Sequence, residues 1–408
     1  MKKKNPSRIL LITAACLLAA GTAACGGKTE ETKARTEEAS ESQEEKAAEA
    51  KKDGAEELDY DNMTAEDLVK GLIDKENLSD EEYLWLLSTY RYVPINDDLS
   101  IDYNNITTKA FSLLNDKGVG YGCSEESLKK LLASEYPQLR AEAYENMDSL
   151  FGISDEHKEM AKEALKTERD PFVLCAGIRA LGNEGGSDPE AAAFLLDMAK
   201  HEDPRVRSEA AVWIGSSWNK NMEGAVEAEI AMMNDPDEEV ASNACRYCGG
   251  LGDDRVVEPL QAILNDDERY EDHGECIASL TELWLDYPFH ENTSETAYRA
   301  CMDYYRRTPR SENIPFWATI SEPGNISEDR FSAWREKATY YDPAELISVM
   351  TELALDPAVD WIGRGGAFDV IKAHGGKEAL EALKPQVDAL TDENASLVQS
   401  SFEEKLKD

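Results

Sequence analysis

Two cysteines stand at the spacing that dithiol redox sites and zinc sites use most often. Cys245 and Cys248 form a Cys-x-x-Cys pair, which in redox enzymes begins a helix that follows a strand. Here the pair falls at the end of a helical pattern, and no second Cys-x-x-Cys completes a zinc site. We interpret both residues as small core residues or as part of a structural disulfide. The sequence does not choose a pairing among the six candidates, which are Cys123, Cys175, Cys245, Cys248, Cys276 and Cys301.

No other group of residues has the spacing of a catalytic, metal or nucleotide site. The glycine-rich segment Lys117–Gly122 follows a helical pattern rather than a strand and lacks the Gly-Lys-Ser/Thr ending of a phosphate-binding loop. Pairs of carboxylates arise by chance in a chain with 83 acidic residues. The sequence therefore predicts no enzyme, no cofactor and no metal site. The five histidines are scattered; they are His157, His201, His273, His290 and His374.

The charge of the chain restricts its partners. The 83 acidic residues outnumber 43 basic residues, which gives a net charge of −40. Such a surface repels the phosphate backbone of nucleic acids and the anionic surface of a membrane. The sequence therefore predicts no nucleic-acid partner, membrane attachment only through an anchor, and an unknown protein partner of basic character.

The N-terminus has the three segments of a secretory signal peptide. Four basic residues precede a short apolar run from Ile9 to Ala20, and small residues follow up to Cys25. The stretch Thr22-Ala23-Ala24-Cys25 resembles a bacterial lipoprotein signal, which implies cleavage before Cys25 and lipidation of its thiol. An ordinary cleaved signal with an incidental cysteine is the alternative. The resemblance predicts a protein anchored by lipid on the extracytoplasmic face of the cell membrane.

The composition changes sharply after the anchor. Residues 26–57 contain no aromatic residue and no apolar residue larger than Ala, so we expect a disordered, charged linker. A folded, all-α part follows, with extended structure expected only at 101–103 and 106–108. The expected regions are a signal peptide (1–24), the lipidated Cys25 with the linker (25–57), an N-terminal helical cap region (58–133), regular repeats (134–268), a degenerate helical segment with an irregular loop (269–341), and a C-terminal repeat and cap (342–408).

A repeat of 33–34 residues determines the predicted fold. One column holds Leu139, Val173, Val206 and Val240, and a later column holds Gly182, Gly215 and Gly249. Each unit predicts a helix–turn–helix, in which an Asp-Pro pair begins the first helix and glycine ends it. We expect Val206 in the core and Glu209 on the outward face.

The motifs Asp170-Pro171, Ala180-Leu181-Gly182 and Asp188-Pro189-Glu190-Ala191 resemble HEAT repeats of the short bilin-lyase type. This resemblance implies an α-solenoid and places the arginine that links successive repeats at Arg140, Arg207 and Arg364. It favours a surface-displayed, protein-binding scaffold. An envelope assembly or chaperone-like factor and a lyase-type enzyme are the alternatives, although an export signal argues against the enzyme.

Partner contacts are expected on the second helices, which we predict to line a groove, and in the irregular segment. The candidate residues are Asp197, Lys200, Glu227 and Glu258 on second helices, and Tyr304, Arg306, Arg307 and Trp317 in the irregular segment. The two arginines have a second interpretation, as favourable charge near a helix C-terminus that pairs with nearby acids.

Replacement of the anchoring thiol tests the lipoprotein signal. Cys25→Ala should abolish incorporation of a fatty-acid analogue during metabolic labelling, because this thiol follows the small residues that come after the apolar run. Cys16 also follows Thr-Ala-Ala, but it is followed by more apolar residues and leaves too short an apolar run before it. Cys16→Ala is the matched control and should leave labelling intact. A Cys25→Ala protein that still incorporates the label would contradict the assignment.

Overall fold

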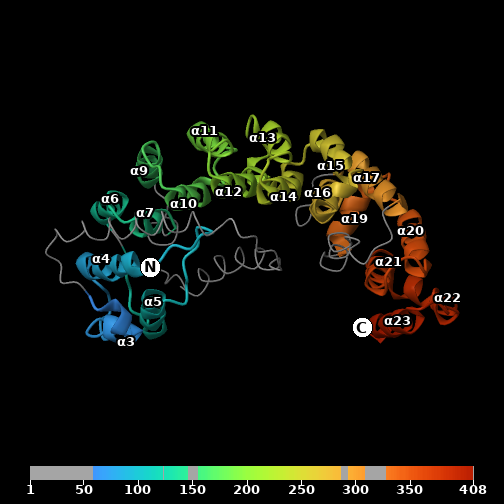
Figure 1. The fold of residues 1–408 in the computed structure, drawn as a ribbon, viewed down its shortest axis with the longest axis horizontal. Helices are drawn as coiled ribbons and strands as arrows, with labels where there is room; N and C mark the ends of the chain where they lie inside the picture. Colours follow the sequence, from blue (N-terminus) through green and yellow to red (C-terminus); the bar gives the residue numbers. More distant parts are fainter. Residues whose placement is uncertain (1–57, 123, 146–154, 286–292, 308–327, 408) are drawn as a thin grey trace, which may run out of the picture. The chain divides into compact units, whose positions relative to one another are not determined.

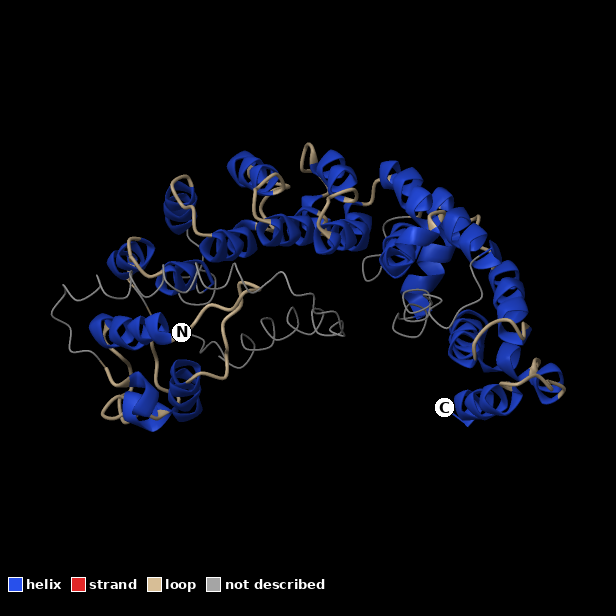
Figure 2. Ribbon diagram, viewed as in Figure 1, coloured by secondary structure: helices blue, strands red, loops and turns tan. Residues whose placement is uncertain are grey.

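The computed structural model describes residues 58–122, 124–145, 155–285, 293–307 and 328–407, and within these ranges the chain is all-α (Figure 2). Two isolated β-bridges, Asn77 to Gly120 and Ile95 to Ile101, are the extended pairings found there. The prediction of an all-α solenoid is confirmed. In the same ranges, no helix is both long and apolar enough to cross a membrane. The predicted signal peptide, Cys25 and the linker lie outside the described residues.

The described residues divide into two compact units. The smaller unit holds residues 58–93 and 103–122, and its core is aromatic: Tyr83 stacks on Tyr121 with ring centroids 5.5 Å apart. The extended segment expected at 106–108 is wrong, because the Asn105 side chain caps a helix there by accepting from the Thr108 backbone N–H. The helices of this unit are η3 (Tyr60–Asn62), α3 (Ala65–Leu68), α4 (Asp80–Ser88), η4 (Thr89–Tyr92) and α5 (Ile106–Lys117).

The larger unit contains the repeats. It begins with α6 (Glu125–Leu132), which the sequence had placed in the N-terminal cap region. The first helices of successive repeats are α7 (Pro137–Glu145), α10 (Pro171–Leu181), α12 (Pro204–Ile214), α14 (Glu238–Tyr247) and α16 (His273–Leu285). The second helices are α9 (Asp155–Leu165), α11 (Pro189–Met198), α13 (Ala225–Met232), α15 (Val257–Leu264) and α17 (Glu295–Arg307).

The remaining elements of the larger unit connect or follow these repeats. The short 3-10 helices are η5 (Ser217–Asn219), η6 (Cys248–Leu251), η7 (Asp254–Val256) and η8 (Asp267–Asp272). The C-terminal helices are α19 (Glu328–Lys337), α20 (Pro343–Leu355), α21 (Trp361–Glu381), α22 (Lys384–Asp388) and α23 (Ala395–Lys407).

First helices pack side by side and form a continuous layer (Figure 1). The glycine column permits this packing. A Cβ atom at Gly215 would lie 2.6 Å from the Tyr247 backbone, and one at Gly249 would lie 2.5 Å from the Ser279 carbonyl oxygen. Gly215 has an ordinary φ of −69°. Glycine is therefore needed there for close approach between helices, and not for a left-handed turn.

The Asp-Pro pairs begin the helices as the sequence predicts. Asp203 accepts a hydrogen bond from the Arg205 backbone N–H, and Pro204 occupies the first turn, where a missing N–H costs nothing. Asp170 and Asp188 cap α10 and α11 in the same way. The apolar column is buried, with Val173, Val206 and Val240 at 0% exposure.

One arginine in several repeats joins the turns on either side of its helix. Arg207 on α12 donates two hydrogen bonds to Asp235, at 2.8 and 2.7 Å, and its Nη1 donates to the carbonyls of His201 and Glu202. The guanidinium thus satisfies backbone carbonyls that follow α11 and holds the acid that follows α13. Hydrogen bonding by Arg207 lowers the pKa of Asp235.

The same arrangement recurs in two other repeats. Arg140 binds Glu168, and Arg364 binds Asp392, each pair being 28 residues apart as for Arg207 and Asp235. The prediction that these arginines link repeats is confirmed. Leu174 and Ala241 occupy the column in two further repeats and are buried.

Glu209, which was predicted on the outward face, is half-buried and has two partners. Its carboxylate accepts from the Arg179 guanidinium at 3.0 Å and from the Trp213 Nε1–H at 2.8 Å. Arg179 also binds Glu145. These contacts form a polar chain across α7, α10 and α12, so a charge reversal at Glu209 would disrupt two contacts.

Removal of the inter-repeat guanidinium should destabilise the larger unit. Arg207→Ala should lower the free energy of unfolding by about 2–3 kcal/mol, because it leaves a partly buried carboxylate and two carbonyls without their charged donor. Arg255→Ala is the matched control. Its guanidinium is 57% exposed, and we expect a loss under about 1 kcal/mol. Urea unfolding followed by circular dichroism measures both, and equal losses would contradict the role of Arg207.

Candidate binding surface

The second helices present an outward face that no neighbouring first helix covers. The helix α11 packs against α10 and α12, and α13 packs against α12 and α14 (Figure 1). These contacts bury one side of each helix, for example Leu195 on α11 and Met232 on α13. The other side faces away from the layer of first helices and carries the predicted contact residues. The prediction that the second helices line a groove is wrong, because they lie on the outer edge of the curved larger unit (Figure 1).

The candidate residues of the second helices are all exposed. Asp197 lies in the last turn of α11, and Lys200 directly follows that helix. Glu227 lies in the first turn of α13, and Glu258 in the first turn of α15. Their exposure makes them available to a partner, whereas their role in binding stays a prediction. Only Glu227 has a strong neighbour among them, since it pairs with Arg255 across 2.5 Å.

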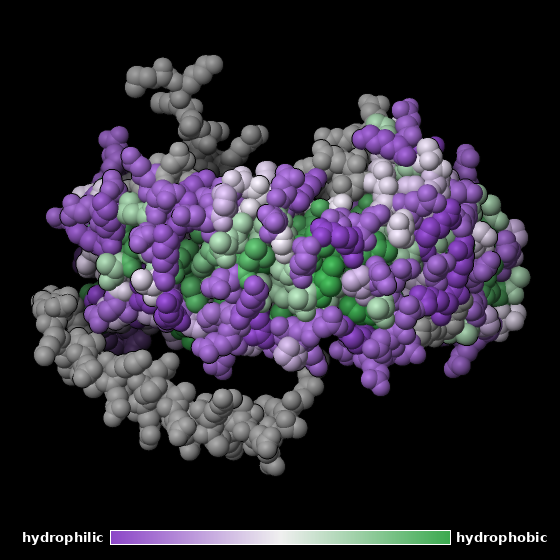
Figure 3. Space-filling view, turned by 90° about the horizontal axis from the view of Figure 1, so that it is seen from above, coloured by the Kyte–Doolittle hydropathy of each residue, from purple (hydrophilic) through white to green (hydrophobic). Residues whose placement is uncertain are grey.

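The same helices also expose apolar side chains. Viewed from the side of the second helices, hydrophobic residues form a band between hydrophilic margins (Figure 3). Phe194 and Leu196 on α11 and Ile230 on α13 are only half-buried. An apolar band with acidic margins can bind an amphipathic segment, because the band contributes burial and the margins select positive charge.

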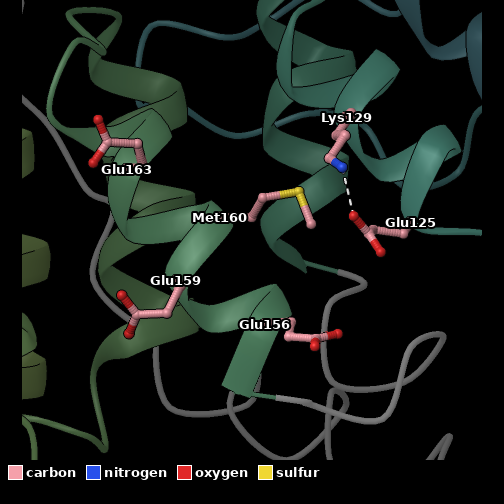
Figure 4. Close-up of a pocket in the computed structure, with 6 residues that line it drawn as sticks. All are labelled: Glu125, Lys129, Glu156, Glu159, Met160 and Glu163. Carbon is pink, nitrogen blue, oxygen red and sulfur yellow. Dashed lines mark hydrogen bonds and ion pairs between the residues drawn. The ribbon is translucent and has the colours of Figure 1, made fainter.

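A pocket opens between α6 and α9 (Figure 4). Its volume is about 630 Å³. Met160 provides an apolar wall, and four glutamates with one lysine complete the lining, so the pocket carries a net negative charge. Lys129 pairs with Glu125 on the same helix. The lining residues are Glu125, Lys129, Glu156, Glu159, Met160 and Glu163.

Ion pairs from α9 to the segment before α11 hold this pocket wall in place. Lys158 donates to Glu184 at 2.8 Å, and Lys162 donates to Asp188 at 2.8 Å. The hydrogen bond to Asp188 raises the pKa of Lys162, and Glu159 adds to the effect. Lys162 therefore stays protonated and joins α9 to the start of α11, and it also pairs with the pocket residue Glu159.

The contact residues predicted in the irregular segment differ in their exposure. Tyr304 is 1% exposed and its hydroxyl lies 3.3 Å from His273 Nδ1, so its proposed role as a contact residue is wrong. It occupies the buried side of α17. Arg306 is exposed and pairs with Glu345 at 2.5 Å, while Arg307 contacts Asn265. Trp317 lies outside the described residues.

Two features of this surface were not predicted. The pocket was missed because Glu156, Glu159 and Glu163 have an ordinary helical spacing that cannot be distinguished among so many acids. Trp218 was also missed. It lies in η5 and is 67% exposed, which is unusual for tryptophan. Its position in the loop after α12, outside the regular repeat, is the signal that could have identified it.

Burial of Cys245 and Cys248 confirms that they are core residues. Cys175, Cys245, Cys248, Cys276 and Cys301 are buried free thiols in the structure, and Cys123 lies outside the described residues. Burial raises the pKa of the Cys248 thiol. Among the described residues, no group of three His, Cys, Asp or Glu side chains could hold a metal ion.

One acid of α13 points inward. Glu229 is 0% exposed, and neither of its carboxylate oxygens has a hydrogen-bond partner among the described residues. Burial raises its pKa well above the usual value, and the nearby Cys245 adds to the effect. Burial therefore favours the protonated form of Glu229, because an ionised carboxylate there would lack both water and a counter-charge.

Comparison with known proteins supports the repeat assignment over part of the chain. The family model for HEAT repeats matches residues 125–215 and 195–281. Two crystal structures of engineered proteins are similar at 16% identity: one covers 68% of this chain and 76% of its own with a TM-score of 0.33, the other 69% and 96% with a TM-score of 0.24. No curated protein matches the sequence.

The buried acid gives a pH-dependent prediction. The pKa of Glu229 is raised in the folded state. The free energy of unfolding is therefore highest below the unfolded-state pKa and falls as pH rises from there toward the folded-state pKa. Relative to Glu229→Gln, the wild type should lose about 1.4 kcal/mol of unfolding free energy per pH unit above roughly pH 4.3. Glu227→Gln, on the exposed side of the same helix, should show no such slope. A pH-independent difference for Glu229→Gln would contradict the assignment.

Proposed function

We propose that this protein is a lipid-anchored, extracytoplasmic scaffold that binds a basic protein on the outward face of its second helices. The observation that carries the proposal is an apolar band with hydrophilic margins on this face (Figure 3), on helices that also carry exposed acids. HEAT repeats in general serve as protein-interaction scaffolds, and the matched residues include α11, α13 and α15.

The charge supports a basic partner. Asp197, Glu227 and Glu258 are exposed on three successive second helices, and the pocket between α6 and α9 adds four glutamates. A net charge of −40 attracts a positively charged partner over distances beyond direct contact. The apolar residues Phe194, Leu196 and Ile230 would then supply the burial that makes the complex stable.

The proposed lipid anchor would determine where the binding face lies relative to the membrane. Lipidation at Cys25 would fix the N-terminus at the membrane, and a linker of about 32 residues would allow the folded part to stand roughly 30 Å away when flexible. The acidic repeats would remain off an anionic membrane surface, since like charges repel. The protein would therefore display its binding face to soluble or surface partners.

A charge-reversal double mutant tests the binding face. Full-length protein immobilised on beads should retain a saturable basic partner from solubilised envelope, and Asp197→Lys combined with Glu258→Lys should reduce retention at least about tenfold. Association of the retained partner should slow as salt rises, because exposed charges steer the encounter.

The control changes the same charge elsewhere. Glu393→Lys combined with Glu404→Lys reverses two exposed acids in the C-terminal region and should leave binding unchanged. Equal effects of both double mutants would show that only net charge matters and would contradict a defined face. Retention of many unrelated proteins without saturation would favour the chaperone-like alternative.

A further inference from the structure

Two consecutive first helices bring cysteines from adjacent repeats into register. Where η6, which directly continues α14, contacts α16, Cys248 Sγ donates to Ser279 Oγ at 3.5 Å, and the two residues are 31 positions apart. Cys245 and Cys276 have the same separation, and each stands three residues earlier on its helix. Because three residues are close to one helical turn, these two thiols form the preceding rung of the same contact.

Direct contacts support this register. The Cys276 thiol is hydrogen-bonded with Cys245, and both sulfurs are fully buried. The backbones approach closely one turn later, where Gly249 has no room for a Cβ beside Ser279. Ser279 also accepts from the Gly249 backbone N–H at 3.1 Å. The two helices are therefore in close backbone contact one turn away from the two thiols.

We propose that Cys245 and Cys276 form a disulfide that covalently joins the repeats of α14 and α16. The next rung pairs Cys248 with Ser279, so this helix contact offers a single disulfide. The Arg269 guanidinium lies 4.0 Å from Cys245 Sγ, which places a positive charge beside the sulfur that attacks first. The reaction concerns stability of the array and is independent of the partner-binding face.

The chemistry requires a disulfide as oxidant, which an extracytoplasmic location would supply. The Cys245 thiolate attacks the oxidant, forms a mixed disulfide and releases one thiol. The Cys276 thiolate then attacks the Cys245 sulfur, forms the intramolecular bond and releases the second thiol. The two cysteines lose two electrons and two protons, and the oxidant is reduced to two thiols.

Peptide mapping of the wild-type chain decides the proposal without any mutation. Full-length protein purified in detergent is reduced, unfolded, refolded in oxidised and reduced glutathione, alkylated and digested with trypsin without reductant. Trypsin places Cys245 in peptide 221–246, Cys248 in 247–255 and Cys276 in 270–299. The expected product joins 221–246 to 270–299 and disappears on reduction. Alkylation of both thiols, or a link from 221–246 to 247–255, would overturn the proposal.

Variants separate the link from its consequence. Cys248→Ser should still form the cross-linked peptide, whereas Cys276→Ser should not. Addition of reductant should lower the thermal midpoint of the wild type and of Cys248→Ser by about 5 °C or more, and leave that of Cys276→Ser unchanged. A cross-linked peptide with no change in thermal midpoint would overturn the stabilising role. Because the assay contains neither membrane nor partner, its outcome does not depend on the proposed function.

Discussion

The close approach of consecutive first helices is the constraint on which the rest of this structure depends. Gly215 and Gly249 lie so near the backbone of the next repeat that no side chain fits between. The distance between these helices is therefore set by backbone contact, which side chains cannot adjust. A fixed distance limits the space available to each residue of the apolar column, such as the buried Val206. It also fixes the register in which polar pairs across the helix contact, such as Cys248 and Ser279, meet.

The arginines that link repeats, such as Arg207, satisfy polar groups that this packing leaves at the helix ends. A helix layer stacked so tightly leaves the turns at its ends with unpaired carbonyls and acidic caps. Arg207 satisfies both at once, since it reaches a carbonyl before its helix and an acid in the following repeat. Where Leu174 or Ala241 replaces the arginine, the column becomes buried apolar surface. The repeat thus keeps its geometry with either a polar clamp or apolar packing.

The sequence predicted the features that recur and missed those that depend on a single contact. Repetition revealed the Asp-Pro caps, the apolar column and the linking arginines, because each occupies the same place several times. Glu209 looked like an outward acid, yet Arg179 of the preceding repeat and Trp213 of its own helix both donate hydrogen bonds to it. Tyr304 belonged to a run without a repeat to indicate its inward side. A register across 31 residues, such as that of the thiols, follows from packing and not from local pattern.

The two layers divide the chemistry of the chain between them. The layer of first helices tolerates polar atoms only when they are neutral or paired. Burial against this layer raises the pKa of Glu229 and so favours its neutral form, and Arg179 is paired with two carboxylates. The outward layer has no such restriction, because water screens its carboxylates over about 8 Å at physiological salt. The second helices α11 and α13 pack against first helices rather than against each other, so mutual repulsion between their carboxylates is weak. A partner that approaches the whole face meets the sum of these charges, which makes an acidic outer layer cost little in folding while it attracts a basic protein.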